Sequence, residues 1–277
     1  MTRMIAVGTA LPRLRVSQKD ALRFILKNFD LRARTRAFYR RVFSHHSVAT
    51  RHFAVRKLED ILDRDLDRKN ARFEREALRL STLSLKRVLS LARRVPSQVD
   101  FLAAATCTGY LCPGLAARVV DAAGLRHDVP FADLVGMGCG AALPALQAAN
   151  SFCLANPGAL AAVVCTEICS AAMVSDDAPD LVVSNALFGD GSAAVLLQSG
   201  GGKGPALVDT ASLVVPAWRE GLRFRSEKGH LRNVLSPEVP MRAARATRTL
   251  LQKLLHRQGL QSRHKPVDSP PRRSPSA

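Results

Sequence analysis

The chain has no long hydrophobic run and no clear targeting segment. No apolar stretch approaches the roughly 20 residues that span a bilayer. The opening MTRMIAVGTALPRLRVS has too short an apolar segment before its charges for a secretory signal. We therefore expect no membrane partner. Six cysteines scattered over 277 residues, without such a signal, favour reduced thiols in a cytoplasmic protein over a disulfide framework.

Acidic residues are scarce, with 23 Asp and Glu against 41 Lys and Arg, which gives a net charge of +18. Such an excess can neutralise nucleic-acid phosphates. However, aromatic residues make up only 5% of the chain, and it contains no recognisable DNA- or RNA-binding motif. We therefore expect no nucleic-acid partner. A basic surface also suits an anionic phosphorylated cofactor or carrier, so charge alone does not decide the function.

Apolar strands alternate with helical patterns through the first 200 residues. The helical pattern at 71–94 places six apolar residues on one face: Phe73, Ala77, Leu80, Leu85, Val88 and Ala92. Strands are expected within 3–12, 99–107, 131–139, 159–169 and 192–198, with helices at 112–125 and 140–156 and a polar loop after 169. The unalternating strands belong in a sheet covered on both faces. This order predicts a mainly parallel α/β fold.

The segment GGGKGP at 200–205 is expected to link a first unit, 1–200, to a second, 205–258. The second unit should contain a strand at 206–215, a hairpin strand near 222–226 and a helix at 240–256. The remaining residues, 259–277, are rich in proline and arginine near the end and follow no pattern, so we expect them to be disordered.

Cys139 lies between glycines in LVGMGCGAALPAL, at an expected strand-to-helix turn. The unpaired N–H groups and positive end of a helix favour a thiolate there. Gly138 and Gly140 would allow a tight backbone and leave room for an acyl group. On these residues alone, Cys139 is either a nucleophile or a buried cysteine that fills a small gap.

Four segments together resemble the type III polyketide synthases, the chalcone- and stilbene-synthase-like branch of the thiolase superfamily: CTGYLCPG, DLVGMGCGAALPAL, CTEICSAAM and NALFGDGSAAVLL. The resemblance covers residues 3–255, including SVATRHFAVRKLED, and is closer to bacterial than to plant members. It implies an α/β thiolase-like fold with a complete N-terminal half and an incomplete C-terminal half. It also implies a homodimer.

The resemblance makes Cys139 the acyl-accepting nucleophile, which takes a starter from an acyl-CoA before condensation with malonyl-CoA. Phe188 matches the gatekeeper phenylalanine beside that cysteine. Three residues fall where members shape the cavity, and a fourth where plant members reach into the partner's cavity: Cys107, Cys169 and Ala172, and then Cys112. Arg51 lies near residues that contact coenzyme A phosphates, although an exposed surface arginine is the alternative. The coenzyme A thioesters are substrates; no cofactor and no metal are expected.

The chain lacks the family's His-Pro-Gly-Gly and Gly-Asn motifs, which supply the His and Asn for decarboxylation. One hypothesis is truncation by a frameshift, because codons for His264 to Ser276 can encode His-Pro-Gly-Gly in a shifted frame. Resequencing the gene across 259–277 tests it. We expect poor stability and little or no condensation. The alternatives are a ketoacyl-carrier-protein synthase III-like enzyme and a non-catalytic remnant that binds coenzyme A or acyl groups.

Overall fold

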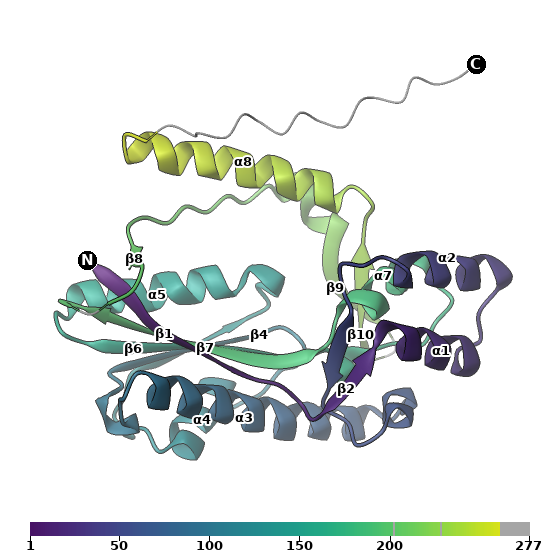
Figure 1. Ribbon diagram of the computed structural model, residues 1–277, viewed down its shortest axis with the longest axis horizontal. Helices are drawn as coiled ribbons and strands as arrows, with labels where there is room; N and C mark the ends of the chain where they lie inside the picture. Colours follow the sequence, from purple (N-terminus) through teal and green to yellow (C-terminus); the bar gives the residue numbers. More distant parts are fainter. Residues whose placement is uncertain (202, 228, 261–277) are drawn as a thin grey trace.

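A six-stranded sheet forms the centre of the computed structural model, which describes residues 1–201, 203–227 and 229–260 (Figure 1). The strand order is β5-β4-β6-β7-β1-β8. The strands are β1 (Thr2–Ala10), β4 (Phe101–Thr106), β5 (Phe131–Val135), β6 (Leu160–Ile168), β7 (Asp190–Ser199) and β8 (Ala206–Leu207). The expected α/β fold is confirmed.

The sheet is mixed, so the prediction of a mainly parallel sheet is wrong. Only β4 pairs in parallel, with β5 and β6, whereas β7 runs antiparallel to both β6 and β1. The connection from β6 to β7 stays at one end of the sheet, so that Ile168 pairs with Asp190. A chain that turns back without crossing the sheet must return antiparallel.

Helices cover both faces of the sheet, as the unbroken apolar strands predict. Figure 1 shows α3 (Leu66–Leu91) and α4 (Leu115–Ala123) below the sheet and α5 (Ala142–Ala155) above it. All of β4 is buried between them. The α3 face is also confirmed: five of the six expected residues are buried, and Ala92, just past the helix end, packs against their cluster. Gly124 ends α4 in the left-handed conformation, with φ of 75°.

A row of four buried hydroxyl groups joins α3 to the sheet. Ser81 on α3 hydrogen-bonds Thr166 on β6 at 2.6 Å, and Thr166 bonds Ser192 on β7 at 2.7 Å. Ser192 also bonds Ser84, one turn along α3, at 2.7 Å. Each hydroxyl in this row therefore has a partner inside an otherwise apolar core.

A second, smaller core lies at one end of the sheet. It is formed by the hairpin β2 (Leu14–Ser17) and β3 (Thr50–Phe53) with α1 (Gln18–Asn28), α2 (Ala33–Phe43) and α7 (Pro179–Leu187). The expected polar loop after residue 169 is confirmed only for residues 173–178, because the short α6 (Cys169–Ala172) precedes it and α7 follows it. Pro179 occupies the first turn of α7, where its missing N–H does no harm, and Val182 and Ala186 pack in this core.

The strand expected at 206–215 is wrong beyond Leu207. β8 pairs only Ala206 and Leu207 with the first residues of β1, and the chain then runs past the start of that strand. The hairpin and the helix are confirmed as β9 (Leu222–Glu227), β10 (His230–Leu235) and α8 (Val239–Arg257). Four short 3₁₀ helices complete the described chain: η1 (Leu58–Leu62), η2 (Pro96–Gln98), η3 (Gly138–Gly140) and η4 (Pro216–Gly221).

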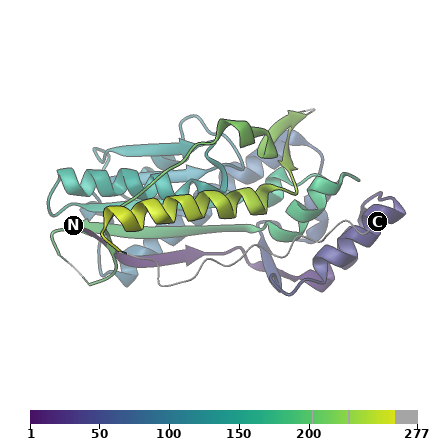
Figure 2. The same ribbon diagram turned by 90° about the horizontal axis from the view of Figure 1, so that it is seen from above.

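No residue of α8 is buried. Figures 1 and 2 show α8 on the α5 side of the sheet, farther out than α5. Its contacts are mainly polar, such as Arg257 with Asp209 at 3.2 Å and the Arg242 guanidinium over the Trp218 ring. Large apolar side chains are exposed on α8 and on the segment after β8: Val208, Leu213, Val214, Met241 and Leu251.

The domain boundaries at 200 and 258 stay a prediction. The expected disorder and the frameshift hypothesis concern residues that, from 261 to 277, lie outside the described part of the chain. None of the helices in the described ranges combines the length and apolarity needed to cross a bilayer.

Candidate active site

Cys139 stands at a turn between strand and helix, as the sequence predicts. β5 ends at Val135, η3 holds the cysteine, and α5 begins at Ala142. Gly136 and Gly138 have φ of 77° and 62°, a conformation that favours glycine. The first turn of α5 has no side-chain cap and includes Pro144, which lacks an N–H, so the N–H groups of Ala142 and Leu143 are the ones left without a side-chain acceptor.

The Cys139 side chain is exposed, so it does not fill a gap in the core. A Cβ built on Gly138 or on Gly140 would meet no described atom within 4 Å, which leaves the room that the sequence predicts. No hydrogen bond joins the Cys139 sulfur to any residue that the structure describes. Among the described residues, the Cys139 thiol is therefore accessible from solvent, and no base lies within hydrogen-bonding distance of its sulfur.

Two other predicted residues, Cys107 and Cys169, lie near Cys139. Burial raises the pKa of both thiols well above the usual value, and the charges of Glu167 and Cys139 raise it further. Cys107 and Cys169 are therefore protonated near neutral pH. The structure brings three of the six cysteines into one electrostatic neighbourhood and exposes only Cys139 among these three.

Glu167 is a site residue that the sequence reasoning missed. Its carboxylate accepts the backbone N–H groups of Cys107 and Thr108 at 3.0 Å, and the Thr108 hydroxyl at 2.7 Å. The Thr108 hydroxyl oxygen in turn accepts the Ile168 N–H at 2.9 Å. These bonds fix the chain after β4 beside the end of β6. A lone acidic residue in the apolar segment CTEIC was the available signal.

Phe188 directly follows α7, and the turn after it is held by Asp190. The buried Asp190 carboxylate accepts the Ala54 N–H at 2.6 Å, the Ser170 N–H at 2.8 Å and the Ser170 hydroxyl at 2.6 Å. One carboxylate thus joins β3, α6 and β7 directly beside the predicted gatekeeper. The sequence GDG therefore marks a structural clamp in this chain.

Arg51 is buried, so the alternative of an exposed surface arginine is wrong. Its guanidinium donates to the carbonyl oxygens of Asn185 at 2.6 Å and Phe188 at 2.8 Å, and to Gln18 Oε1 at 3.0 Å. The rings of Phe43 and Phe53 cover it at 5.5 and 5.1 Å. A coenzyme A phosphate cannot reach a guanidinium enclosed in this way. The expected phosphate contact does not fit this position, and Arg51 instead holds the backbone of Phe188.

The remaining predicted residues lie on two different segments. Ala172 is the last residue of α6 and is partly buried. Cys112 is exposed and precedes Pro113 through a cis peptide bond. The exposed loop of Cys112 also carries Tyr110, which is 77% exposed. Ala172 thus lies on the same short helix as Cys169, whereas Cys112 is exposed on a separate loop.

Residues 9–204 match a family model described as FAE1/Type III polyketide synthase-like protein. The chain is 30% identical over 278 residues to 3,5-dihydroxyphenylacetyl-CoA synthase of Streptomyces toyocaensis, covering 93% of this chain and 67% of that protein. It is 29% identical to 1,3,6,8-tetrahydroxynaphthalene synthase of Streptomyces peucetius, covering 86% of this chain and 65% of that protein.

Solved structures show the same fold. The 1,3,6,8-tetrahydroxynaphthalene synthase of Streptomyces coelicolor superposes with a TM-score of 0.84 at 24% identity, over 93% of this chain and 74% of that one. The C-terminal type III polyketide synthase domain of Steely1 from Dictyostelium gives 0.82 at 26% identity, over 94% and 74%. The thiolase-like fold expected from the sequence is thereby confirmed.

Proposed function

Because the chain belongs to the FAE1/type III polyketide synthase-like family, we propose that Cys139 takes an acyl group from an acyl-CoA as a thioester. The observation that carries this proposal is the setting of that thiol. Cys139 is exposed at the uncapped start of α5, whereas its neighbours Cys107 and Cys169 are held as thiols. Of these three sulfurs, only that of Cys139 is placed to attack a substrate from outside.

The acyl transfer is a thioester exchange. The Cys139 sulfur attacks the thioester carbonyl carbon, the bond from that carbon to the coenzyme A sulfur breaks, and the thiol proton ends on the released coenzyme A. The free N–H groups at the start of α5 are suited to stabilise negative charge near the sulfur. The clamps made by Glu167 and Asp190 hold the segments of Cys107 and Phe188 in place around the acyl group.

Condensation requires a second step, in which malonyl-CoA loses carbon dioxide and the resulting carbanion attacks the Cys139 thioester. This step needs donors that stabilise the enolate. The 277-residue sequence has neither the His-Pro-Gly-Gly nor the Gly-Asn motif, and the Cys139 sulfur has no described hydrogen-bond partner. We therefore expect this chain to be acylated and to condense malonyl-CoA very slowly.

The cytoplasmic location of the protein also stays a prediction.

A homodimer is the expected assembly. β5 lies at one edge of the described sheet, and Phe131 and Val135 at its two ends are 48% and 45% exposed. An open strand edge with apolar ends favours pairing with another chain. Because β5 leads directly into the Cys139 turn, pairing there would also restrict the approach to the thiol. Sedimentation velocity of the wild type and of Val135→Lys tests this: we expect a dimer that the variant converts to a monomer.

Mass spectrometry of the intact protein tests the proposal after incubation with acetyl-CoA or malonyl-CoA. We expect one acyl adduct on the wild type, none on Cys139→Ser, and a normal adduct on the control Cys112→Ser, which removes another exposed thiol. An adduct that persists in Cys139→Ser would contradict the assignment.

Product analysis with labelled malonyl-CoA separates the alternatives. Carbon–carbon bond formation only with a carrier protein would favour the ketoacyl-carrier-protein synthase III-like alternative. Binding of coenzyme A without any adduct would favour the non-catalytic remnant.

A further inference from the structure

An arginine-rich cleft of about 1100 Å³ opens along the first half of α3, away from the residues around Cys139. Its opposite wall is the β1–β2 connection and the end of β3. Six arginines line it: Arg13, Arg56, Arg68, Arg72, Arg75 and Arg79. Only two carboxylates, Asp60 and Glu76, share the lining, and apolar side chains such as Leu14 and Val55 lie between the charges.

Four of these arginines form a row on one face of α3. Residues 68, 72, 75 and 79 follow the spacing of four, three and four that keeps side chains on one side of a helix. At 1.5 Å per residue, the row is about 16 Å long. Arg75 and Arg79 share a single carboxylate, Glu76, at 3.0 and 2.8 Å, so this pair keeps an excess positive charge.

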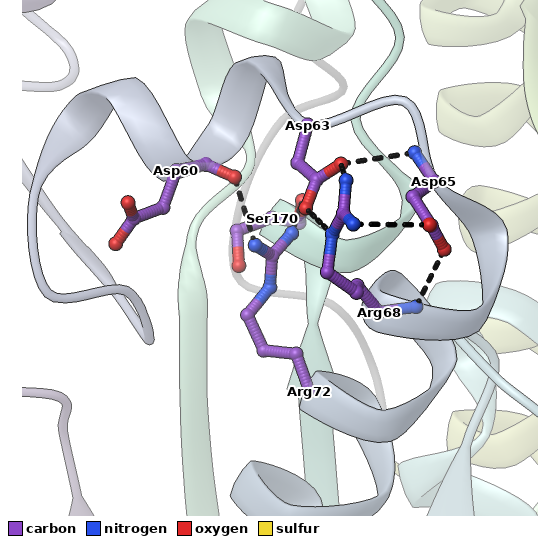
Figure 3. Close-up of polar contacts among 6 residues, drawn as sticks. All are labelled: Asp60, Asp63, Asp65, Arg68, Arg72 and Ser170. Carbon is purple, nitrogen blue, oxygen red and sulfur yellow. Dashed lines mark hydrogen bonds and ion pairs between the residues drawn. The ribbon is translucent and has the colours of Figure 1, made fainter.

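The other two arginines of the row differ in how they are held. Figure 3 shows Arg68 between Asp63 and Asp65, at 2.6 and 3.1 Å, so its charge is matched within the protein. Arg72 instead donates to two backbone carbonyl oxygens, that of Asp60 at 3.0 Å and that of Ser170 at 2.8 Å. It forms no ion pair with a carboxylate in the described chain.

Arg72 is only 8% exposed, and its Nε is buried without a hydrogen-bond partner in the described chain. A buried guanidinium that lacks a carboxylate is unfavourable unless an anion compensates its charge. Across the cleft, the exposed side chains of Arg13 and Arg56 form no hydrogen bond or ion pair with described residues. Arg13, Arg56 and Arg72 thus line one cleft without an ion pair to any described carboxylate, and the charges of Asp190, Asp63 and Asp60 act on Arg72 only from a greater distance.

We propose that this cleft binds a small molecule that carries two or more phosphate groups. Guanidinium groups bind phosphate oxygens in pairs, and arginines on both walls can reach neighbouring phosphates. A ligand with a single charge would leave part of the row unmatched. The site is separate from the Cys139 chemistry, since its binding needs no thiol and its lining includes none of the predicted catalytic residues.

Calorimetric titration of the full chain with pyrophosphate, at about 0.15 M salt to screen non-specific attraction, tests the proposal. We expect one site and binding of inorganic monophosphate that is weaker by about tenfold. ADP serves as a second probe. Tighter binding of ADP than of pyrophosphate assigns the site to nucleotides, whereas equal or weaker binding assigns it to free inorganic diphosphate.

The variant Arg13→Gln/Arg56→Gln should raise the pyrophosphate Kd by about tenfold or more, because it removes charged donors on one wall. The control Arg15→Gln/Arg34→Gln removes two exposed, unpaired arginines outside the cleft and should change it less than about twofold. Cys139 acylation should stay unchanged in both, so failure here is distinct from failure of the proposed function. No binding by the wild type, or equal loss in both variants, would overturn the proposal.

Discussion

Replacing Arg51 with methionine should destabilise the fold by about 3 kcal/mol. Three acceptors lose their donor, namely Gln18 Oε1 and the Asn185 and Phe188 carbonyl oxygens. Leaving each unsatisfied costs about 1–3 kcal/mol, or about 6 kcal/mol for the three together. Burial lowers the pKa of Arg51 well below its usual value, to about 10, so removing the charge returns about 3 kcal/mol. The cost of the three unsatisfied acceptors minus this gain gives the expected loss in unfolding free energy, about 3 kcal/mol.

Urea unfolding at pH 7, followed by circular dichroism, measures this loss. The matched control is Arg15→Met, since Arg15 lies on the same hairpin, is exposed and has no described partner. It should change the unfolding free energy by less than about 0.5 kcal/mol. The reasoning is refuted if Arg51→Met is as stable as the wild type and only raises the KM for acyl-CoA, because that is the pattern of a phosphate contact.

Three further substitutions test the fold. Burial and the charge of Arg72 lower the pKa of Lys69 to about 8, against 10.5 unfolded, so the folded state loses this proton first and the stability of the wild type relative to Lys69→Met should rise by about 3 kcal/mol from pH 8 to 10.5. Urea unfolding across that range should show no such contribution in Lys69→Met. Gly124→Ala should lower stability by about 1 kcal/mol at its positive φ, seen as a lower urea midpoint at unchanged slope. Leu80→Ala should cost about 2–5 kcal/mol in a thermal melt, because Leu80 is fully buried, and a smaller loss would show that the core closes around the gap.

Periodic segments were predictable because their pattern is local. The buried face of α3 follows from helical spacing. The end of α4 follows from Gly124, because glycine readily adopts the positive φ found there. The position of Cys139 followed from its glycines and from the order of the motifs around it. The direction of β7 did not, since it depends on where the connection after Ile168 returns to the sheet. The residue pattern of β7 by itself does not indicate whether the strand runs parallel or antiparallel to its neighbours.

Residues with charged side chains were the hardest to interpret. Arg51, Glu167 and Asp190 all act within the folded chain, on partners at least 20 residues away in the sequence. A single charged residue in an apolar segment suggests burial, but it does not identify the partner that makes burial possible. α7 was missed for a related reason. It is only nine residues long, too short for a helical period to stand out, and Val182 and Ala186 are buried by packing in the second core with α2.

The row of Ser81, Ser84, Thr166 and Ser192 has a consequence for how the core can vary. Leucine and alanine side chains tolerate a small shift of a helix along a sheet, because one apolar contact can replace another. Buried hydroxyl groups do not tolerate such a shift, because a displacement of α3 by one turn would leave them without hydrogen-bond partners. α3 also carries the arginine row and packs against β1, β6 and β7. Four small polar groups thus fix where the arginine row lies relative to the sheet, whereas the apolar residues around them can be exchanged for one another.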